Sequence, residues 1–351
     1  MKKIVFTGGG TGGHIMPNLS IIEKLVDKYE IYYLGSSGME REIISKQKNI
    51  KFIEIPAVKL ERRLTPKNLL IPFKLLKSIG ICKKILKNIS PCLIFSKGGY
   101  VSIPVCVAGN KLDIPIITHE SDLTIGLANK IIARKSKYLC CSFKETAINY
   151  GKNAIHTGSP IRSKIFSGDK NKIKEISKFD KTKPIIMITG GSLGAQSINK
   201  FIWNNINSLT EKYSIIHLVG KNKINNSIHN SNNYIQIDFT DSIENYFDLS
   251  DIVITRAGSN TIFELLSIYK PMLLIPLSKK ASRGDQILNA ENFHKNGFAE
   301  YILEEELSLN LFINKIDSTL KNKLKYINNM KKNNIGNGTD NIIELIENTT
   351  K

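Results

Sequence analysis

Two glycine-rich turns, one near the start of each half of the chain, are the residues whose spacing most clearly indicates chemistry. The first occupies residues 8–14 (GGGTGGH) and the second residues 190–195 (GGSLGA). Each follows a short apolar run and precedes a helical pattern, so each turn is predicted to open a helix. Free amides at a helix N-terminus, with the positive end of the helix dipole, bind phosphate groups, and glycine lets a ligand approach the backbone. The two turns therefore predict an enzyme with a phosphate site in each half.

Two common nucleotide sites fit the first turn poorly. The spacing from Gly8 to Gly13 matches the GxGxxG dinucleotide fingerprint. That fingerprint also requires an acidic residue at the end of the second strand, whereas the run at 31–34 ends in Gly-Ser-Ser at 35–37. A P-loop requires a lysine where His14 stands. A nicotinamide or flavin enzyme and a nucleotide hydrolase are both disfavoured.

His14 is the first candidate for proton transfer. It follows the glycines directly and lies on the first turn of the expected helix. Neighbouring amides and the positive dipole end disfavour the imidazolium, so a neutral ring remains to take a proton from a hydroxyl group. A histidine that only hydrogen-bonds within its own loop is the alternative.

Short β-branched runs alternate with helical patterns in both halves and would place these turns at strand ends. Such alternation is typical of an α/β protein with parallel sheets. The chain has 351 residues, more than one core usually supports, and a polar linker at 167–183 separates the halves. We expect two domains, at 1–163 and 164–351. The strand candidates are 30–34, 51–55, 92–96, 114–118, 138–141, 184–189, 214–219, 234–238, 252–255 and 272–275.

Composition restricts the class of protein and of partner. A formal net charge of +19 indicates an anionic partner, which could be nucleic acid, acidic lipid or a phosphorylated substrate, or reflects only a lysine-rich composition. No apolar run has the length of a signal-peptide core or a membrane span. The five cysteines show no CxxC spacing, so we expect reduced thiols and no metal.

Five segments in order resemble the motifs of the MurG family, the N-acetylglucosaminyltransferases of peptidoglycan biosynthesis. They are residues 8–14, 96–102, 119–122, 190–195 and 256–261. The resemblance implies transfer of GlcNAc from UDP-GlcNAc to the C4 hydroxyl of MurNAc-pentapeptide on undecaprenyl diphosphate, converting lipid I to lipid II. It places the protein at the cytoplasmic face of the cell membrane, in cell wall biogenesis, cell shape and division. It also implies the GT-B fold, in which two Rossmann-like domains face each other across a cleft.

In this family the C-terminal domain binds the donor and the N-terminal domain binds the acceptor, and by analogy the last helix crosses back to the first domain. The helix after Gly258 is expected to stabilise the departing diphosphate through its free amides. Glu264 corresponds to the ribose-binding residue, although the spacing from Thr261 to Glu264 also fits a capping box. The candidate donor contacts are Thr11, Gly12, Gly13, Arg162, Ser192, Thr240, Ser259, Asn260, Thr261, Ile262, Phe263, Glu264 and Gln286.

Several donor contacts have specific expected roles. Gln286 offers an amide to the sugar hydroxyls, and Thr240 is expected to border the uracil pocket. Arg162 corresponds to an arginine at the domain junction, with an ordinary surface arginine as the alternative. Ser192 bonds a phosphate or caps its helix. Asp285 stands where many family members carry His or Gln.

The acceptor side is expected to involve a third glycine turn. Gly98, Gly99 and Tyr100, together with the first turn, would hold the acceptor diphosphate. Glu120 is the second candidate base, or a group that orients the acceptor. Asp122 stands where the family commonly has Asn, so a contact that needs an amide donor is lost. We expect a single in-line displacement that yields a β-linked product, with no metal or other cofactor.

A basic and aliphatic stretch at 59–87 has the composition of a membrane-surface segment. Apolar residues that insert between headgroups alternate with lysines and arginines that meet anionic lipids. Pro72 is expected to prevent one unbroken helix. The alternative is a pair of amphipathic helices packed on the sheet, with lysines in solvent.

Two other functions compete with the transferase. A UDP-GlcNAc 2-epimerase has the same two-domain architecture and no lipid acceptor. A basic RNA-binding protein would interleave its basic residues with aromatic ones, whereas the densest basic stretch here is aliphatic. We therefore expect no nucleic-acid partner.

Overall fold

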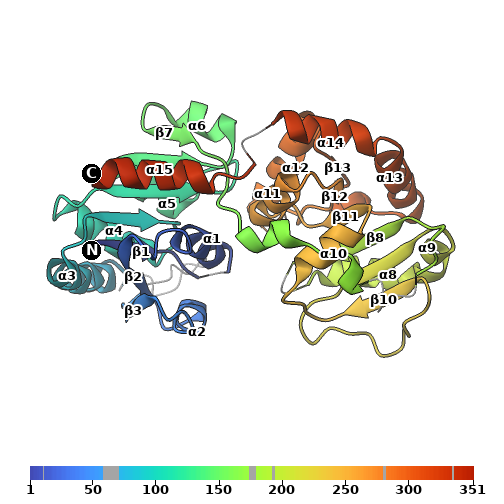
Figure 1. Cartoon of the computed structure of the whole chain (residues 1–351), viewed down its shortest axis with the longest axis horizontal. Helices are drawn as coiled ribbons and strands as arrows, with labels where there is room; N and C mark the ends of the chain where they lie inside the picture. Colours follow the sequence, from blue (N-terminus) through green and yellow to red (C-terminus); the bar gives the residue numbers. More distant parts are fainter. Residues whose placement is uncertain (11, 58–70, 174–178, 192–193, 280–281, 334–335) are drawn as a thin grey trace. The chain divides into compact units, whose positions relative to one another are not determined.

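The computed structural model describes all residues except 11, 58–70, 174–178, 192–193, 280–281 and 334–335. The chain forms two compact units. Unit 1 comprises residues 1–162 and 337–351, and unit 2 comprises residues 163–336. Both units have a parallel sheet with helices, which confirms the α/β class with two Rossmann-like domains (Figure 1).

Unit 1 contains a seven-stranded sheet in the order β3-β2-β1-β4-β5-β6-β7. All neighbouring strands pair in parallel, so the carboxyl ends of the strands lie at one edge of the sheet. The strands are β1 (Lys2–Thr7), β2 (Tyr29–Gly35), β3 (Ile50–Glu54), β4 (Leu93–Ser96), β5 (Ile116–Glu120), β6 (Tyr138–Cys141) and β7 (Ala154–His156).

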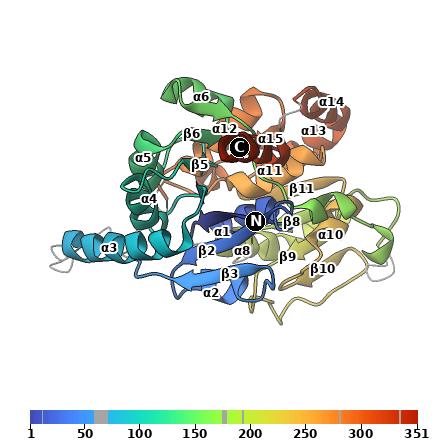
Figure 2. The same ribbon diagram turned by 60° about the vertical axis from the view of Figure 1, so that its left-hand side comes forward.

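Helices cover both faces of this sheet. Successive side chains of a strand point to opposite faces, and accordingly Ile4 and Phe6 join one buried cluster whereas Val5 joins another. The second cluster includes buried side chains of α3 and α4, which lie side by side in Figure 2. The helices of unit 1 are α1 (Gly12–Ile22), α2 (Met39–Ile44), α3 (Ile71–Ile89), α4 (Ser102–Asn110), α5 (Leu127–Ile132), α6 (Lys144–Tyr150) and α15 (Thr339–Thr350).

Helix α15 belongs to unit 1 although it lies at the end of the sequence. Ile342 and Ile346 are fully buried in the same cluster as Ile4 and Phe6. At its surface, α15 forms ion pairs with lysines at 24 and 28, and Figure 1 shows it in red beside the strands of the first unit.

The stretch at 59–87, which Pro72 is expected to interrupt, is described only from Ile71 onward. Helix α3 is continuous from Ile71 to Ile89. Pro72 is its second residue, and proline is tolerated in the first turn because that amide has no partner within the helix.

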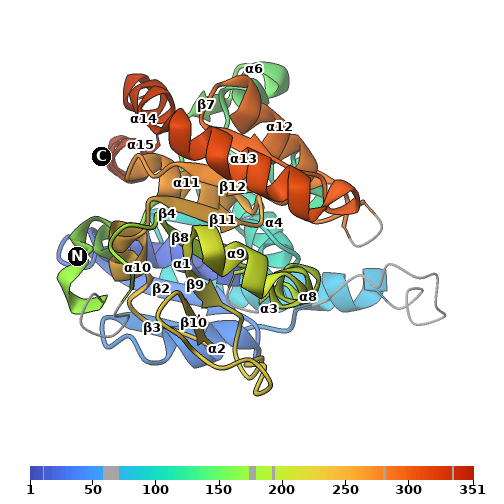
Figure 3. The ribbon, with the colours of Figure 1, turned by 90° about the vertical axis from the view of Figure 1, so that its right-hand side faces the viewer.

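Unit 2 contains a six-stranded parallel sheet in the order β10-β9-β8-β11-β12-β13. Its strands are β8 (Ile185–Thr189), β9 (Ser214–Leu218), β10 (Tyr234–Ile237), β11 (Ile252–Thr255), β12 (Met272–Leu274) and β13 (Ala299–Tyr301). Its helices are α8 (Gln196–Asn204), α9 (Ile206–Lys212), α10 (Ile243–Leu249), α11 (Ser259–Ser267), α12 (Asp285–Lys295), α13 (Leu309–Lys321) and α14 (Lys323–Lys332) (Figure 3).

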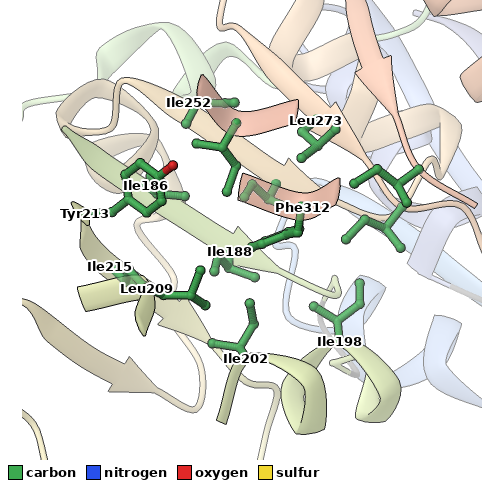
Figure 4. Close-up of a cluster of buried hydrophobic side chains, with 14 of the residues drawn as sticks. Ile186, Ile188, Ile198, Ile202, Leu209, Tyr213, Ile215, Ile252, Leu273 and Phe312 are labelled. Carbon is green, nitrogen blue, oxygen red and sulfur yellow. The ribbon is translucent and has the colours of Figure 1, made fainter. Parts of the chain in front are cut away.

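An aliphatic core lies under α8, α9 and α13. Figure 4 shows side chains of β8, β9 and β11 meeting Ile198, Ile202 and Phe312. Since β8 and β11 are central neighbours, the loops that follow them emerge side by side at the carboxyl edge of the sheet. The sheet therefore places the second glycine turn next to the segment around Gly258.

Candidate active site

In unit 1, three of the predicted segments lie at one edge of the sheet. Strands β1, β4 and β5 are consecutive neighbours and run in parallel. The loops that follow them carry residues 8–10, 97–100 and 121–122. The topology thus brings together the first glycine turn, the third glycine turn and the segment with Glu120.

The first glycine turn is fixed by a buried carboxylate that the sequence did not single out. Glu40 is 1% exposed; its Oε1 accepts a hydrogen bond from the Gly10 amide at 2.6 Å, and its Oε2 accepts one from Ser36 Oγ at 3.0 Å. A Cβ on Gly9 would lie 1.6 Å from Glu40 Oε1. The Gly10 amide is therefore already bonded within the protein, and Thr11 lies outside the described residues.

The third glycine turn packs against the first. Gly98 and Gly99 have φ angles of 85° and 81°, which favour glycine. A Cβ on Gly99 would lie 2.6 Å from the Gly9 carbonyl oxygen and 3.3 Å from His14 Cδ2. Likewise, a Cβ on Gly10 would lie 2.8 Å from Tyr100 Cε1, so the Tyr100 ring packs closely on the Gly10 backbone. Glycine at 99 thus permits the close contact between this turn and the His14 ring.

His14 is the third residue of α1 and is half-buried. Burial, as the main cause, and the positive charge of Lys97 together lower the pKa of His14 to about 4. The backbone of Lys97 acts in the opposite direction on this pKa and is outweighed. The ring is therefore neutral at neutral pH, as expected. The causes are burial and the charge of Lys97, whereas the sequence had suggested the helix dipole.

Lys97 is a buried cation beneath the same turn. It is 2% exposed, and its Nζ lies 2.6 Å from His119 Nδ1 and also donates to Ser121 Oγ. His119 Nε2 lies 3.1 Å from the Gly158 carbonyl oxygen, so this nitrogen carries the proton and Nδ1 accepts from Lys97. Burial lowers the pKa of Lys97 to about 8, against the raising effect of Glu120 and Asp122.

Glu120 holds the loop that follows β5. It is 7% exposed, and burial is the main cause that raises the pKa of its carboxyl group. Its Oε1 accepts hydrogen bonds from the amides of Ser121 at 2.9 Å and Asp122 at 3.1 Å. Its Oε2 accepts from the Gly126 amide at 2.9 Å and from Asn129 Nδ2 at 3.0 Å. Of the two expected roles, this set of bonds suits orientation better than proton transfer.

In unit 2, the predicted diphosphate helix begins where the sequence indicated. Helix α11 starts at Ser259, and Gly258 is its N-cap with an extended backbone and no side-chain cap. The capping-box alternative for Glu264 is therefore wrong, because Thr261 is the third residue of the helix and cannot be its N-cap. The amide of Ile262 already donates to the Gly258 carbonyl at 3.2 Å.

Two expected donor contacts have their side chains in the core. Ile262 is 0% and Phe263 is 4% exposed, and Phe263 packs edge-on against Phe293 at a centroid distance of 5.4 Å. Both side chains are therefore buried away from the surface. The first-turn amides, those of residues 259–261, and the half-buried Glu264 remain as candidates on this helix.

Helix α12 brings Gln286 to the entry of α11. Gln286 Oε1 accepts from the Leu277 amide at 3.0 Å, and its Nε2 lies 4.0 Å from the position that a Cβ on Gly258 would occupy. Asn289 Nδ2 donates to the Ala257 carbonyl at 3.1 Å and so holds the same loop from one turn further along. Asp285 instead forms an ion pair with Arg283 at 2.7 Å.

Other predicted contacts are not brought to this point. Thr240 follows β10, which β9 and β8 separate from β11, and its Oγ1 accepts from the Ser242 amide at 3.1 Å. Arg162 is the last residue of the first segment of unit 1. Ser192 lies outside the described residues.

The described residues contain neither a group of metal ligands nor a membrane span. Within this part of the chain, no three His, Cys, Asp or Glu side chains are grouped as a metal site. In the same residues, no helix combines the length and apolar character needed to cross a membrane.

Comparison with known proteins identifies the family. Residues 4–139 match the glycosyltransferase family 28 N-terminal domain, and residues 185–346 match its C-terminal domain. The UDP-N-acetylglucosamine–N-acetylmuramyl-(pentapeptide) pyrophosphoryl-undecaprenol N-acetylglucosamine transferase of Clostridium tetani is 46% identical over 99% of this chain and 98% of its own. The corresponding transferase of Clostridium novyi is 47% identical over 98% of both chains. The chain belongs to the MurG family.

Solved structures support the fold of this MurG-family chain. Acinetobacter baumannii MurG superimposes with a TM-score of 0.79, 23% identity and coverage of 99% of this chain and 100% of that one. The UDP-GlcNAc 2-epimerase of Neisseria meningitidis also superimposes, with a TM-score of 0.64, 13% identity and coverage of 99% and 100%. The epimerase shares the fold, whereas the high full-length sequence identity is to transferases.

Proposed function

We propose that this protein transfers GlcNAc from UDP-GlcNAc to the C4 hydroxyl of MurNAc-pentapeptide on undecaprenyl diphosphate, converting lipid I to lipid II in peptidoglycan biosynthesis. The observation that carries the proposal is the 46% identity, over 99% of the chain, to a transferase named for that reaction. In this proposal unit 1 binds the acceptor and unit 2 binds the donor; the units divide at 162/163 and 336/337, where the sequence predicted one division at 163/164.

His14 is the proposed general base. The pKa of His14 is lowered to about 4, so the ring is neutral and one of its nitrogens has a lone pair to accept the proton of the acceptor hydroxyl. As that proton moves to the imidazole, the hydroxyl oxygen bonds to C1 of GlcNAc and the bond from C1 to the UDP oxygen breaks. The attack occurs opposite the leaving group and therefore inverts the α-linked donor to a β-linked product.

The proposed donor contacts in unit 2 converge on the entry of α11. The amides of Ser259, Asn260 and Thr261 stabilise negative charge on the departing UDP, because they are the first amides of a helix and lie at its positive end. Glu264 accepts hydrogen bonds from the ribose hydroxyls, and Gln286 binds the sugar. Ile262 and Phe263 support this helix from the core.

The remaining donor contacts carry over from the family resemblance. Thr240 would border the uracil base, and Ser192 and Arg162 would meet the diphosphate. Gly12 and Gly13 open α1 next to His14 and would approach the transferred sugar through their backbone.

Acceptor binding is proposed at the third glycine turn. Gly98, Gly99 and Tyr100 would hold the acceptor diphosphate. Glu120 acts as a positioning residue for this loop, since both of its oxygens accept hydrogen bonds from residues 121–129. The Asp122 amide donates one of these bonds to Glu120 Oε1, and the Asp122 side chain would accept from a hydroxyl or amide donor of the acceptor.

The membrane contact is proposed at the start of α3. Phe73 is 72% and Leu76 61% exposed, with Lys74 and Lys77 on the same turns, whereas most later apolar residues of the helix are buried in the core. Exposed apolar groups flanked by lysines suit a surface of anionic lipid. The protein would then be peripheral at the cytoplasmic face, and this proposal includes no nucleic-acid partner. Of the basic stretch, residues 58–70 lie outside the described residues.

The test of the reaction is incubation with radiolabelled UDP-GlcNAc and a short-chain lipid I analogue. Label is expected in the lipid only when both substrates and the protein are present. Conversion of UDP-GlcNAc without the acceptor would favour the epimerase. Tight UDP-GlcNAc binding without transfer would contradict the proposed acceptor.

A further inference from the structure

A continuous chain of polar side chains lies buried beneath the second glycine turn. Trp203 Nε1 lies 3.1 Å from Tyr234 OH, which lies 3.0 Å from His217 Nδ1. His217 Nε2 lies 3.1 Å from Asn199 Oδ1, and Asn199 Nδ2 donates to the Val219 carbonyl at 2.8 Å. His217 is fully buried, and Tyr234 and Asn199 are each 1% exposed.

The direction of every hydrogen bond in this chain is determined. The Val219 carbonyl only accepts, so the Asn199 amide nitrogen faces it and Asn199 Oδ1 accepts from His217 Nε2, which carries the proton. Nδ1 of the neutral ring then accepts from Tyr234 OH. An indole N–H only donates, so Tyr234 OH in turn accepts from Trp203. Burial lowers the pKa of His217 to about 3, so the ring stays neutral and keeps one orientation.

The hydrogen-bonded chain ends at the Val219 carbonyl, which contacts Gly194 of the second glycine turn. A Cβ on Gly194 would lie 2.0 Å from the Val219 carbonyl oxygen and 3.0 Å from Gly220 Cα, so the two segments are in direct backbone contact. Gly194 has a φ of 67° and donates its amide to the Gly191 carbonyl at 2.8 Å. The Val219 carbonyl is thereby held between the Asn199 amide and the backbone of Gly194.

We propose that His217 is a positioning residue for the sugar-nucleotide diphosphate: through Asn199 and Val219 it sets the place of Gly194 at the entry of α8. The inference rests on the proposed function, in which this turn contacts the donor. It extends that function to a buried strand residue that touches neither substrate. Loss of the His217 bond frees the Asn199 amide to rotate and releases the Val219 carbonyl, so the turn loses its fixed position.

The test compares His217→Phe, which keeps a ring of similar shape but no polar atom, with His217→Gln, whose amide reaches the Nε2 position and can still donate to Asn199. We expect His217→Phe to raise both the KM and the Kd for UDP-GlcNAc about 10-fold, the size of one lost buried hydrogen bond, with kcat nearly unchanged. His217→Gln should recover most of the affinity. Tyr213→Phe is the matched control, because it removes a buried tyrosine hydroxyl bond to Asp317 of 2.5 Å in the same unit.

Three results would overturn the inference. One is an unchanged KM and Kd in folded His217→Phe, and another is an equal rise in Tyr213→Phe, which would indicate general loosening of the unit. Should His217→Phe not fold, Tyr234→Phe removes the hydroxyl that bonds His217 Nδ1 and Trp203 Nε1 but leaves the bond from His217 to Asn199. This variant must raise the KM about threefold, and a wild-type KM in it is the third result. Wild-type protein that binds no UDP-GlcNAc would instead refute the proposed function itself.

Discussion

The acid limb of the pH–rate profile is the sharpest consequence of the environment of His14. The limb of kcat/KM reports the pKa of the base in the free enzyme. With the pKa of His14 lowered by burial and Lys97 to about 4, the ring is about 97% neutral at pH 5.5. An ordinary histidine with a pKa of about 6.5 would be only about 9% neutral there. Wild-type kcat/KM at pH 5.5 should therefore stay within a factor of two of its value at pH 7.5.

Lys97→Met is the perturbation that isolates the electrostatic part of this effect. Removing the buried ammonium raises the pKa of His14, so the acid limb moves toward neutral pH, and Lys97→Arg, which keeps the charge, should leave the limb in place. The assay is initial-rate transfer to a soluble acceptor analogue from pH 4.5 to 8.5, with circular dichroism at each pH to verify folding. A wild-type limb centred near pH 6.5, or a limb in folded Lys97→Met identical to wild type, would refute the reasoning.

Three further predictions concern stability and membrane binding. Glu40→Ala removes two hydrogen bonds to a buried carboxylate and should lower the free energy of unfolding by about 2–4 kcal/mol, measured by urea titration. Glu40→Gln should lower it by less. Equal urea midpoints for Glu40→Ala and wild type would contradict the role given to Glu40. Burial lowers the pKa of His217 to about 3 in the folded protein, whereas the unfolded chain binds a proton at this residue below about pH 6.5. The contribution of His217 to the free energy of unfolding is therefore complete above pH 6.5 and falls by about 1.4 kcal/mol per pH unit below it. Urea unfolding at pH 7 and pH 5 measures this slope, which should be shallower in His217→Gln. Phe73→Ser with Leu76→Ser should weaken sedimentation with anionic vesicles several-fold at low salt while leaving transfer to a soluble acceptor intact; unchanged sedimentation would exclude the start of α3 as the contact.

Local patterns in the sequence predicted the framework of both units. Apolar runs that end in glycine turns identified β1 and β8 and the helices after them, because strand periodicity and glycine chemistry act over a few residues. The same holds for the start of α11 after Gly258. Strands β7 and β13 were not predicted, since their three residues, Ala-Ile-His and Ala-Glu-Tyr, form no apolar run, whereas the equally short β12 is Met-Leu-Leu.

The residues that sequence reasoning missed act through contacts distant in the chain. Glu40 reaches Gly10 across thirty positions, and Lys97 reaches His119 across twenty-two. No local pattern marks either side chain as buried, although a lysine directly after the apolar run at 93–96 was a usable signal. Ile262 was assigned to the ligand by motif alone, whereas its burial follows from the helical period of α11.

The membership of α15 in unit 1 has a consequence for biosynthesis. Residues 337–351 leave the ribosome only after all of unit 2 has been made, and they supply Ile342 and Ile346 to the core that also holds Ile4 and Phe6. Unit 2 is continuous in sequence, and all of it precedes these residues. The amino-terminal unit, although translated first, can therefore complete its core only after helix α15 has been made.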